Sequence, residues 1–240
     1  MNDGAFPLRH PRGPDPASPE GALTCPLAEL ELFAGIDTAA LSGAVGTPTR
    51  MRFAPGEVVF NEGHRSAHVY VVLDGLAKLE RIAIDGRARI VGLGKAGDML
   101  GLSALATGSQ DLRAVALTPL ALCRLGSNEV RAMQHCYPEI CQRMALQWQR
   151  ALSSANEWLT ELAVGTVEQR LARLLLQFPS KDGVTELCTH RELGEMLGNV
   201  QVETISRTFS KWQREAVMIR HGERRRWRIE RRRLTGIAGG

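Results

Sequence analysis

Apolar positions near the carboxyl end of the chain recur at helical spacing in two short segments. They comprise Leu193, Met196 and Leu197 in residues 191–197, and Ile205, Phe209 and Trp212 in residues 201–213. Spacings of three and four place each set on one face of a helix. Gly198-Asn199 separates the two segments, and a glycine-containing turn between such helices is typical of a helix-turn-helix. The pattern therefore predicts this motif, whose second helix can lie in the major groove of DNA.

The second predicted helix has a polar face opposite its apolar one. Its polar side chains recur at intervals of three and four and share one side of the helix: Glu203, Ser206, Arg207 and Lys211. Arginine can donate two parallel hydrogen bonds to guanine, and glutamate can accept one from the cytosine amino group. The alternative interpretation is a solvated helix face that binds nothing. The charge of the neighbouring sequence favours the first interpretation.

Two alternating apolar runs follow, at residues 216–220 and 226–229, with His221-Gly222-Glu223 between them. This pattern predicts a β-hairpin in the position of the wing of a winged helix. Its arginines are Arg220, Arg224, Arg225, Arg226 and Arg228. From Gly165 onward there are 15 Lys+Arg against 9 Asp+Glu, which is +6, so the chain total of +4 leaves −2 for the preceding part. Basic charge confined to one module indicates nucleic-acid binding.

Length and composition favour a two-domain protein of the cytoplasm. The chain has 240 residues, enough for two modest domains, and no uninterrupted apolar run near the ~18 residues of a membrane span. The first residues lack the apolar segment of a secretion signal, which favours a cytoplasmic location. Residues 1–24 are rich in Pro, Gly, Arg and Asp and are predicted to form a disordered arm. The five cysteines contain no CxxC pair and are expected to be free thiols.

Between residues 50 and 125 the pattern changes to short strands separated by turn residues. The expected strands lie at residues 58–60, 68–73, 76–84, 89–93, 114–117 and 120–125. Their regular spacing predicts an antiparallel sandwich or jelly roll, a shape that can enclose a ligand. His64 and His68 lack a glutamate at the spacing of metal-binding jelly rolls, so hydrogen-bonded histidines are preferred to a metal site. Residues 94–98 lack the Gly-Lys-Ser/Thr of a phosphate loop.

A long stretch without Gly or Pro, residues 139–164, joins the two parts. Its apolar positions follow intervals of 4, 4, 3, 4, 3 and 4: Ile140, Met144, Trp148, Ala151, Ala155, Trp158 and Leu162. This near-heptad spacing predicts a helix that forms the seam of a parallel homodimer. The alternative is a helix packed on its own barrel. A two-fold pair would place two recognition helices about one turn of DNA apart.

Taken in order, these parts resemble the Crp–Fnr superfamily of bacterial transcription regulators over residues 25–230. The motifs that carry the resemblance lie at residues 53–57, 62–63, 70–75, 96–101, 168–171 and 189–194. The most specific is Glu203-Thr204-Ile205-Ser206-Arg207, which is similar to the recognition-helix pattern of the Fnr branch.

The resemblance implies an α+β fold: a β-roll, a dimerisation helix and a winged helix-turn-helix. It implies that Glu203, Ser206 and Arg207 read the bases of a palindrome with TTGAT-like half-sites, and that RNA polymerase is a partner. The resemblance also implies that Thr189 contacts the phosphate backbone of the DNA. We expect further contacts with the DNA backbone from Gln201, Thr204, Lys211, Arg224 and Arg225. One departure concerns the turn, where residues 199–202 are one residue longer than in the family. The extra residue must bulge in the turn or lengthen the recognition helix.

The family's known cofactors fit this sequence poorly. Oxygen-sensing Fnr proteins hold a [4Fe–4S] cluster with four cysteines, but only Cys25 and Cys123 match, and Ala22 and Glu31 occupy the other positions. Members that bind cyclic AMP use a glutamate where this chain has Leu102, and an Arg-Ser pair near Asp111-Leu112. Arg113, slightly displaced, is the remaining arginine. An unknown effector, haem or NO sensing, redox chemistry at either cysteine, and no effector all stay open.

The expected organisation is an arm at 1–24, a β-roll sensor at 25–137, a dimerisation helix at 138–164 and a DNA-binding domain at 165–240. The leading hypothesis is a homodimeric, sequence-specific transcription regulator that binds double-stranded DNA. A second is a ligand-binding module that controls a protein partner without sequence-specific DNA binding. A third is a jelly-roll metalloenzyme using His64 and His68. No nucleophile–base arrangement is evident, so we expect no catalysis.

Overall fold

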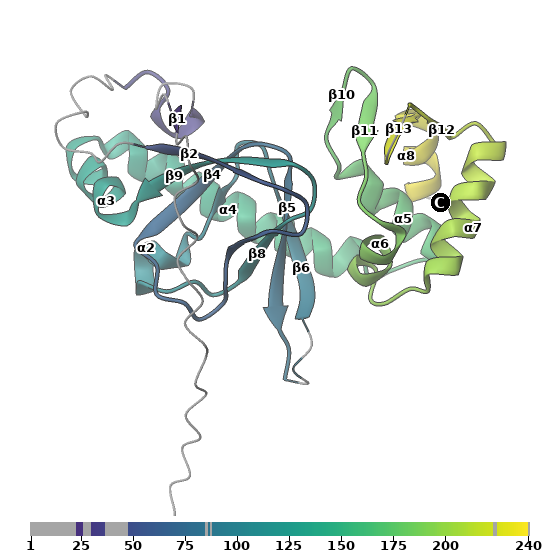
Figure 1. Ribbon diagram of the computed structural model, residues 1–240, viewed down its shortest axis with the longest axis horizontal. Helices are drawn as coiled ribbons and strands as arrows, with labels where there is room; N and C mark the ends of the chain where they lie inside the picture. Colours follow the sequence, from purple (N-terminus) through teal and green to yellow (C-terminus); the bar gives the residue numbers. More distant parts are fainter. Residues whose placement is uncertain are drawn as a thin grey trace, which may run out of the picture.

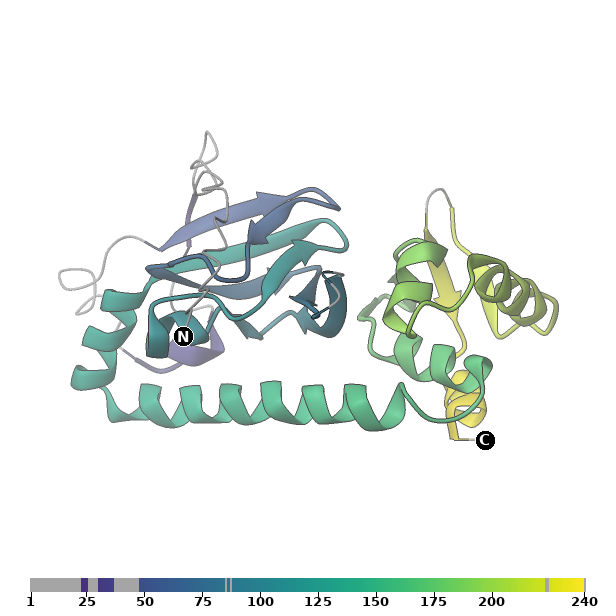
Figure 2. The same ribbon diagram turned by 90° about the horizontal axis from the view of Figure 1, so that it is seen from below.

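The computed structural model describes residues 23–25, 30–36, 48–84, 86, 88–222 and 225–239. A β-roll and a smaller carboxy-terminal domain are joined by one long helix, α4 (Pro138–Glu161), as Figures 1 and 2 show. The predicted α+β architecture is confirmed. The predicted disordered arm falls mainly outside the described residues, but Leu23–Thr24, its last two residues, form strand β1 and pair with β2. No described helix is both long and apolar enough to cross a membrane.

The β-roll consists of two antiparallel sheets. One has the order β1-β2-β9-β4-β7 and the other β3-β8-β5-β6. After β1, its strands are β2 (Thr49–Phe53), β3 (Val58–Phe60), β4 (His68–Asp74), β5 (Leu76–Ile82), β6 (Ala88–Lys95), β7 (Met99–Leu100), β8 (Arg113–Ala116) and β9 (Leu120–Gly126). Short helices complete it: η2 (Glu31–Phe33), α2 (Ser103–Thr107) and α3 (Ser127–Cys136).

Residues of the second sheet alternate between two apolar environments, as period-two side chains must. Ala77 on β5 faces the core of the roll, beside Phe60 and Val72. Leu76 and Leu117 instead belong to the apolar core of the carboxy-terminal domain. The outer side of this sheet therefore packs directly on that domain.

The carboxy-terminal domain is a winged helix-turn-helix with two additions. Its elements are α5 (Val167–Leu176), β10 (Ser180–Lys181), β11 (Val184–Glu186), α6 (His190–Met196), α7 (Val202–Arg214), β12 (Met218–Arg220), β13 (Arg226–Ile229) and α8 (Arg231–Gly239). The strands form one antiparallel sheet, β10-β11-β13-β12. The predicted helix pair and hairpin are present, whereas the hairpin β10–β11 and helix α8 were not predicted.

The first half of α4 packs on the β-roll, and Figure 2 shows the helix running along the roll from α3 to the carboxy-terminal domain. Ile140 and Met144 are 0% and 1% exposed in the core that contains Val69 and Cys123. Gln147 donates from Nε2 to the carbonyl oxygen of Gly97 at 3.0 Å. The first half of α4 is therefore fixed to the β-roll.

Four of the seven positions of the predicted dimer seam pack within the protomer, and the seam itself stays a prediction. Ile140 and Met144 lie in the roll core, and Leu162 lies in the core of the carboxy-terminal domain, against which Trp158 also packs. Leu146 is exposed on another face of α4, whereas four exposed apolar side chains lie at intervals of 4, 3 and 4, with Ala151 beside them. This exposed ridge consists of Trp148, Leu152, Ala155 and Leu159. Only Trp148 and Ala155 of this ridge belong to the predicted seam.

Candidate nucleic-acid interface

The turn between α6 and α7 spans residues 198–201 and contains two left-handed residues. Gly198 and Asn199 both have left-handed backbones, with φ of 80° and 65°, and α7 begins at Val202. The chain returns close to α6, where the Val200 amide donates to the Gly194 carbonyl oxygen at 2.9 Å. A Cβ at position 194 would lie 2.2 Å from the Val200 carbonyl oxygen, so this crossing requires glycine.

One face of α7 is fixed in the core of its domain. Ile205, Phe209 and Trp212 are buried, and Phe209 meets the ring of Trp227 edge-on at 5.5 Å between centroids. The indole Nε1 of Trp212 donates to Glu168 Oε1 of α5 at 2.8 Å. Because the buried face is held by β13 and α5, the opposite face is held in a defined direction.

That opposite face carries the three residues predicted to read bases. Glu203, Ser206 and Arg207 are exposed. Within the described part of the chain, the Glu203 and Arg207 side chains make no hydrogen bond or ion pair. In Figure 1, α7 lies at the edge of the molecule remote from the β-roll. The carboxylate of Glu203, a hydrogen-bond acceptor, and the guanidinium of Arg207, a donor, are therefore accessible to a ligand.

The prediction that Lys211 contacts the DNA backbone stays a prediction, and in the structure its side chain forms an ion pair. Its Nζ lies 2.8 and 2.9 Å from the two carboxylate oxygens of Glu168. This hydrogen bond with Lys211 holds the pKa of the Glu168 carboxyl below its usual value, although partial burial opposes the shift. The contact of Glu168 with Lys211 was not predicted from the sequence, because the two residues lie 43 positions apart.

The other predicted backbone contacts lie around α6, α7 and the wing. Thr189 is the exposed N-cap of α6, where its Oγ1 accepts from the Glu192 amide at 3.2 Å. Gln201 is exposed at the N-cap of α7, Thr204 is half-buried in its first turn, and Arg225 is exposed at the start of the wing strand β13. Arg224 lies outside the described residues. These assignments stay predictions.

Comparison with known proteins assigns both domains. Residues 50–135 match the cyclic nucleotide-binding domain, and residues 169–234 match the Crp-like helix-turn-helix domain. The chain is 27% identical over 207 residues to the nitrogen fixation regulation protein FixK of Bradyrhizobium diazoefficiens, covering 82% of this chain and 86% of FixK. It is 26% identical to the transcriptional activator protein FnrL of Cereibacter sphaeroides, covering 83% and 84%.

Solved structures are similar to this chain over both domains and the helix that joins them. TTHA1359 of Thermus thermophilus, a transcriptional regulator of the CRP/FNR family, is 25% identical, with a TM-score of 0.61 over 80% of this chain and 98% of that one. The structure of FixK2 from Bradyrhizobium japonicum has the same fold, with a TM-score of 0.70 at 22% identity, over 80% and 98% of the two chains. This chain belongs to the Crp–Fnr superfamily.

The residues of this Crp–Fnr β-roll do not offer a cyclic phosphate the expected arginine. Arg113, the remaining arginine near Asp111, donates from Nη1 to Glu80 Oε2 at 3.1 Å. Glu80 also binds Lys78 Nζ at 2.8 Å. Lys78 and Glu80 alternate along β5 with Ala77, so this ion cluster lies on the outer side of the sheet. Arg113 is therefore occupied away from the roll core.

The two cysteines that match the cluster ligands of Fnr proteins are neighbours in the roll. Cys25 and Cys123 are both buried in one apolar core, where burial, followed by a hydrogen bond with Cys25, raises the pKa of the Cys123 thiol well above its usual value. Glu31, at a third ligand position, is bound to Arg150 at 3.0 and 3.1 Å. The described residues contain no group of three or more potential metal ligands. Two buried cysteines and an ion-paired glutamate do not fit a [4Fe–4S] cluster.

Proposed function

We propose that this Crp–Fnr protein regulates transcription as a homodimer that binds a palindromic DNA site with TTGAT-like half-sites. The observation that carries the proposal is that Glu203 and Arg207 are exposed, and without a side-chain partner among the described residues, on a helix whose other face is fixed in the core. A bidentate contact of Arg207 with guanine and acceptance by Glu203 from a cytosine amino group are the contacts these side chains can make. The names of FixK and FnrL describe a regulator and a transcriptional activator, which supports activation as the function.

The exposed ridge supports the proposed dimer. Leu152 is 64% and Leu159 70% exposed in the protomer, although both are apolar. Side chains at intervals of 4, 3 and 4 share one face of a helix, the spacing at which two helices interdigitate. A second copy of α4 packed along this ridge would bury them and place two α7 helices in one two-fold symmetric particle.

The proposed contacts with DNA phosphates and with RNA polymerase rest on the positions of these residues and on the family resemblance. The phosphates beside each half-site would be bound by Thr189, Gln201, Thr204, Lys211, Arg224 and Arg225. RNA polymerase would be the protein partner, and binding to chromosomal DNA would place the protein in the cytoplasm. The protein would act without catalysis, and the effector of its β-roll stays open.

Substitution of Arg207 by lysine tests the proposal, because lysine keeps the charge but not the planar donor fork. Fluorescence anisotropy would measure the affinity of both proteins for a TTGAT palindrome and for a scrambled duplex at one salt concentration. We expect the variant to bind scrambled DNA as the parent does, and to lose roughly 5- to 150-fold in preference for the palindrome, from ~1–3 kcal/mol per bidentate contact.

An unchanged preference in Arg207→Lys would remove Arg207 from the base-reading role. A parent protein without any preference for the palindrome would favour the alternative function, a module that acts on a protein partner.

A further inference from the structure

The carboxyl ends of three helices converge on two arginines of α5. Arg173 Nη1 donates to the carbonyl oxygens of Glu161 and Val164, at the end of α4, at 2.7 Å each. Its Nε donates to the Ala238 carbonyl oxygen near the end of α8 at 2.9 Å. Arg170 Nε donates to the carbonyl oxygen of Leu162, the C-cap of α4, at 2.6 Å. Its Nη2 donates to the carbonyl oxygen at the C-cap of α6, Leu197.

These hydrogen bonds provide donors for carbonyl groups at the helix ends that have no partner within the helix. The last carbonyl groups of a helix lack partners within it, and each carboxyl end carries a partial negative charge of about half an elementary charge. Helix α4 ends at Glu161, and Gly165, with a left-handed φ of 96°, lies in the turn that leads to α5. Arginine is suited to this position because its rigid fork of donors can bind two carbonyl oxygens at once. Arg170 and Arg173 lie three residues apart and so share one side of α5.

Arg170 connects the dimer helix with the DNA-reading motif directly. One of its nitrogens binds the end of α4, and another binds Leu197, the residue immediately before the turn that leads to α7. Two residues earlier on α5, Glu168 binds Lys211 and Trp212 of α7. Helix α5 therefore holds both helices of the motif and the end of α4.

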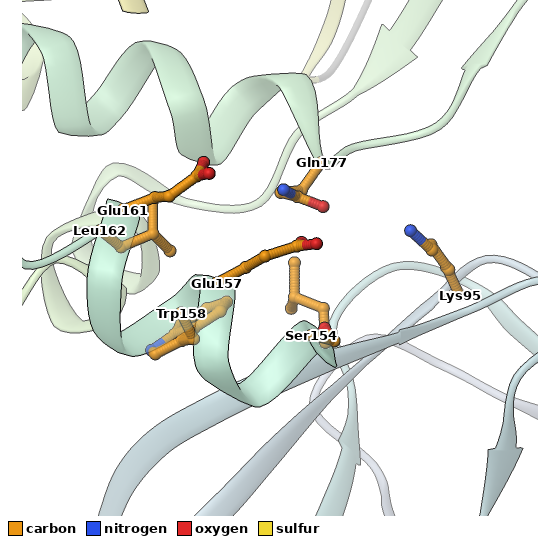
Figure 3. Close-up of a pocket in the computed structure, with 8 residues that line it drawn as sticks. Lys95, Ser154, Glu157, Trp158, Glu161, Leu162 and Gln177 are labelled. Carbon is orange, nitrogen blue, oxygen red and sulfur yellow. The ribbon is translucent and has the colours of Figure 1, made fainter. Parts of the chain in front are cut away.

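The other connection between the β-roll and the carboxy-terminal domain is less directional. Leu76 and Leu117 contribute apolar packing, which constrains distance more than angle. Beside that packing lies a pocket lined by residues of β6, of α4 and of the end of α5. Figure 3 shows Lys95, Glu157 and Gln177 pointing toward it from these three elements. Among the described residues, Lys95 makes no ion pair with Glu157 or Glu161 across it. Among the described residues, the hydrogen bonds of α5 to the end of α4 are directional contacts at this junction.

We propose that Arg170, assisted by Arg173, is a positioning residue that fixes the angle between the dimer helix and the recognition helix. The proposal rests on the proposed function, since the angle matters only if two copies bind one duplex. In such a dimer this angle sets the separation and rotation of the two α7 helices. It therefore sets which half-site spacing the dimer accepts, because each added base pair rotates one half-site by about 34°.

The test compares Arg170→Gln with Arg231→Gln in the full-length chain. Arg231 is the matched control, since it also donates to two backbone carbonyl oxygens, those of Leu176 at 2.7 Å and Phe178 at 3.4 Å. Among the described residues these bonds join α8 to the end of α5 and the segment just after it, and they do not involve α4. Affinity is measured for palindromes whose spacer is optimal for the parent, or one base pair shorter or longer, and for a duplex with a single half-site. Arg170→Lys, which keeps the charge without the fork, is measured alongside as a less disruptive variant, and thermal unfolding identifies the folded proteins.

We expect the Arg170 variants to lose roughly 2- to 30-fold in their preference for the optimal spacer, the usual range for residues that couple distant sites. Their affinity for a single half-site should equal that of the parent, because Glu203 and Arg207 are untouched. Arg231→Gln should keep the parent's spacing preference. Spacing preference unchanged in the folded Arg170 variants, or lost equally in Arg231→Gln, would overturn the proposal. A parent protein that ignores spacing altogether would instead refute the proposed function.

Discussion

The exposed ridge of α4 gives the most quantitative prediction, through the substitution Leu152→Ala. Full burial of a leucine side chain is worth ~1.5–3 kcal/mol. Leu152 is 64% exposed in the protomer, so its burial in a dimer would contribute about 1–2 kcal/mol per copy, from the same scale. A two-fold interface contains each residue twice, and alanine keeps a small part of the apolar area. The substitution should therefore weaken dimerisation by about 2–3 kcal/mol, roughly a 30- to 150-fold increase in the dissociation constant.

Sedimentation equilibrium over a range of protein concentrations measures this constant. Leu146→Ala is the matched control, because Leu146 is 46% exposed on the same helix but lies about a third of a turn away from Leu152. It should leave the dissociation constant within about threefold of the parent value, since an exposed substitution away from the interface changes free energies by ~0.5 kcal/mol. Equal effects of the two substitutions, or none from Leu152→Ala, would refute the assignment of the ridge as the seam.

Two further predictions concern the carboxy-terminal domain. Glu168→Gln should lower the free energy of unfolding in urea at pH 7, because it removes the ion pair with Lys211. The carboxyl has a lowered pKa in the folded state, so its contribution is complete above its ordinary value of 4.5 and is lost as the pH falls through the lowered value. The difference between parent and variant should thus narrow below pH 4.5, and a constant difference would contradict the ion-pair explanation. Gly194→Ala should cost ~1–3 kcal/mol because of the clash with Val200, whereas Gly236→Ala, with open space around its Cβ, should be neutral or stabilising in thermal unfolding.

The helix-turn-helix could be predicted from sequence because its determinants are local. Ile205, Phe209 and Trp212 repeat at helical spacing, and these residues form the buried face of α7. The residues of its other face were identified by the same periodicity, and they are exposed. The Gly-Asn pair marked the turn, and both residues have the left-handed backbone that glycine and asparagine tolerate best.

The exposed ridge of α4 and the bonds of Arg170 could not be predicted in the same way because they depend on tertiary contacts. Helix α4 carries overlapping apolar stripes, and periodicity alone does not show which one the β-roll covers. The buried Ile140 and Met144 and the exposed Leu152 and Leu159 are equally compatible with a heptad. The bonds of Arg170 join segments up to 27 residues apart in sequence, and no local spacing reveals them.

The number of protomers on one symmetric duplex tests the central claim most directly. Mass photometry of the protein with a TTGAT palindrome should show a complex heavier than the free duplex by twice 26.3 kDa, and no such complex with a scrambled duplex of equal length. A single protomer per palindrome, or equal occupancy of the scrambled duplex, would contradict a dimer that reads two half-sites with paired α7 helices.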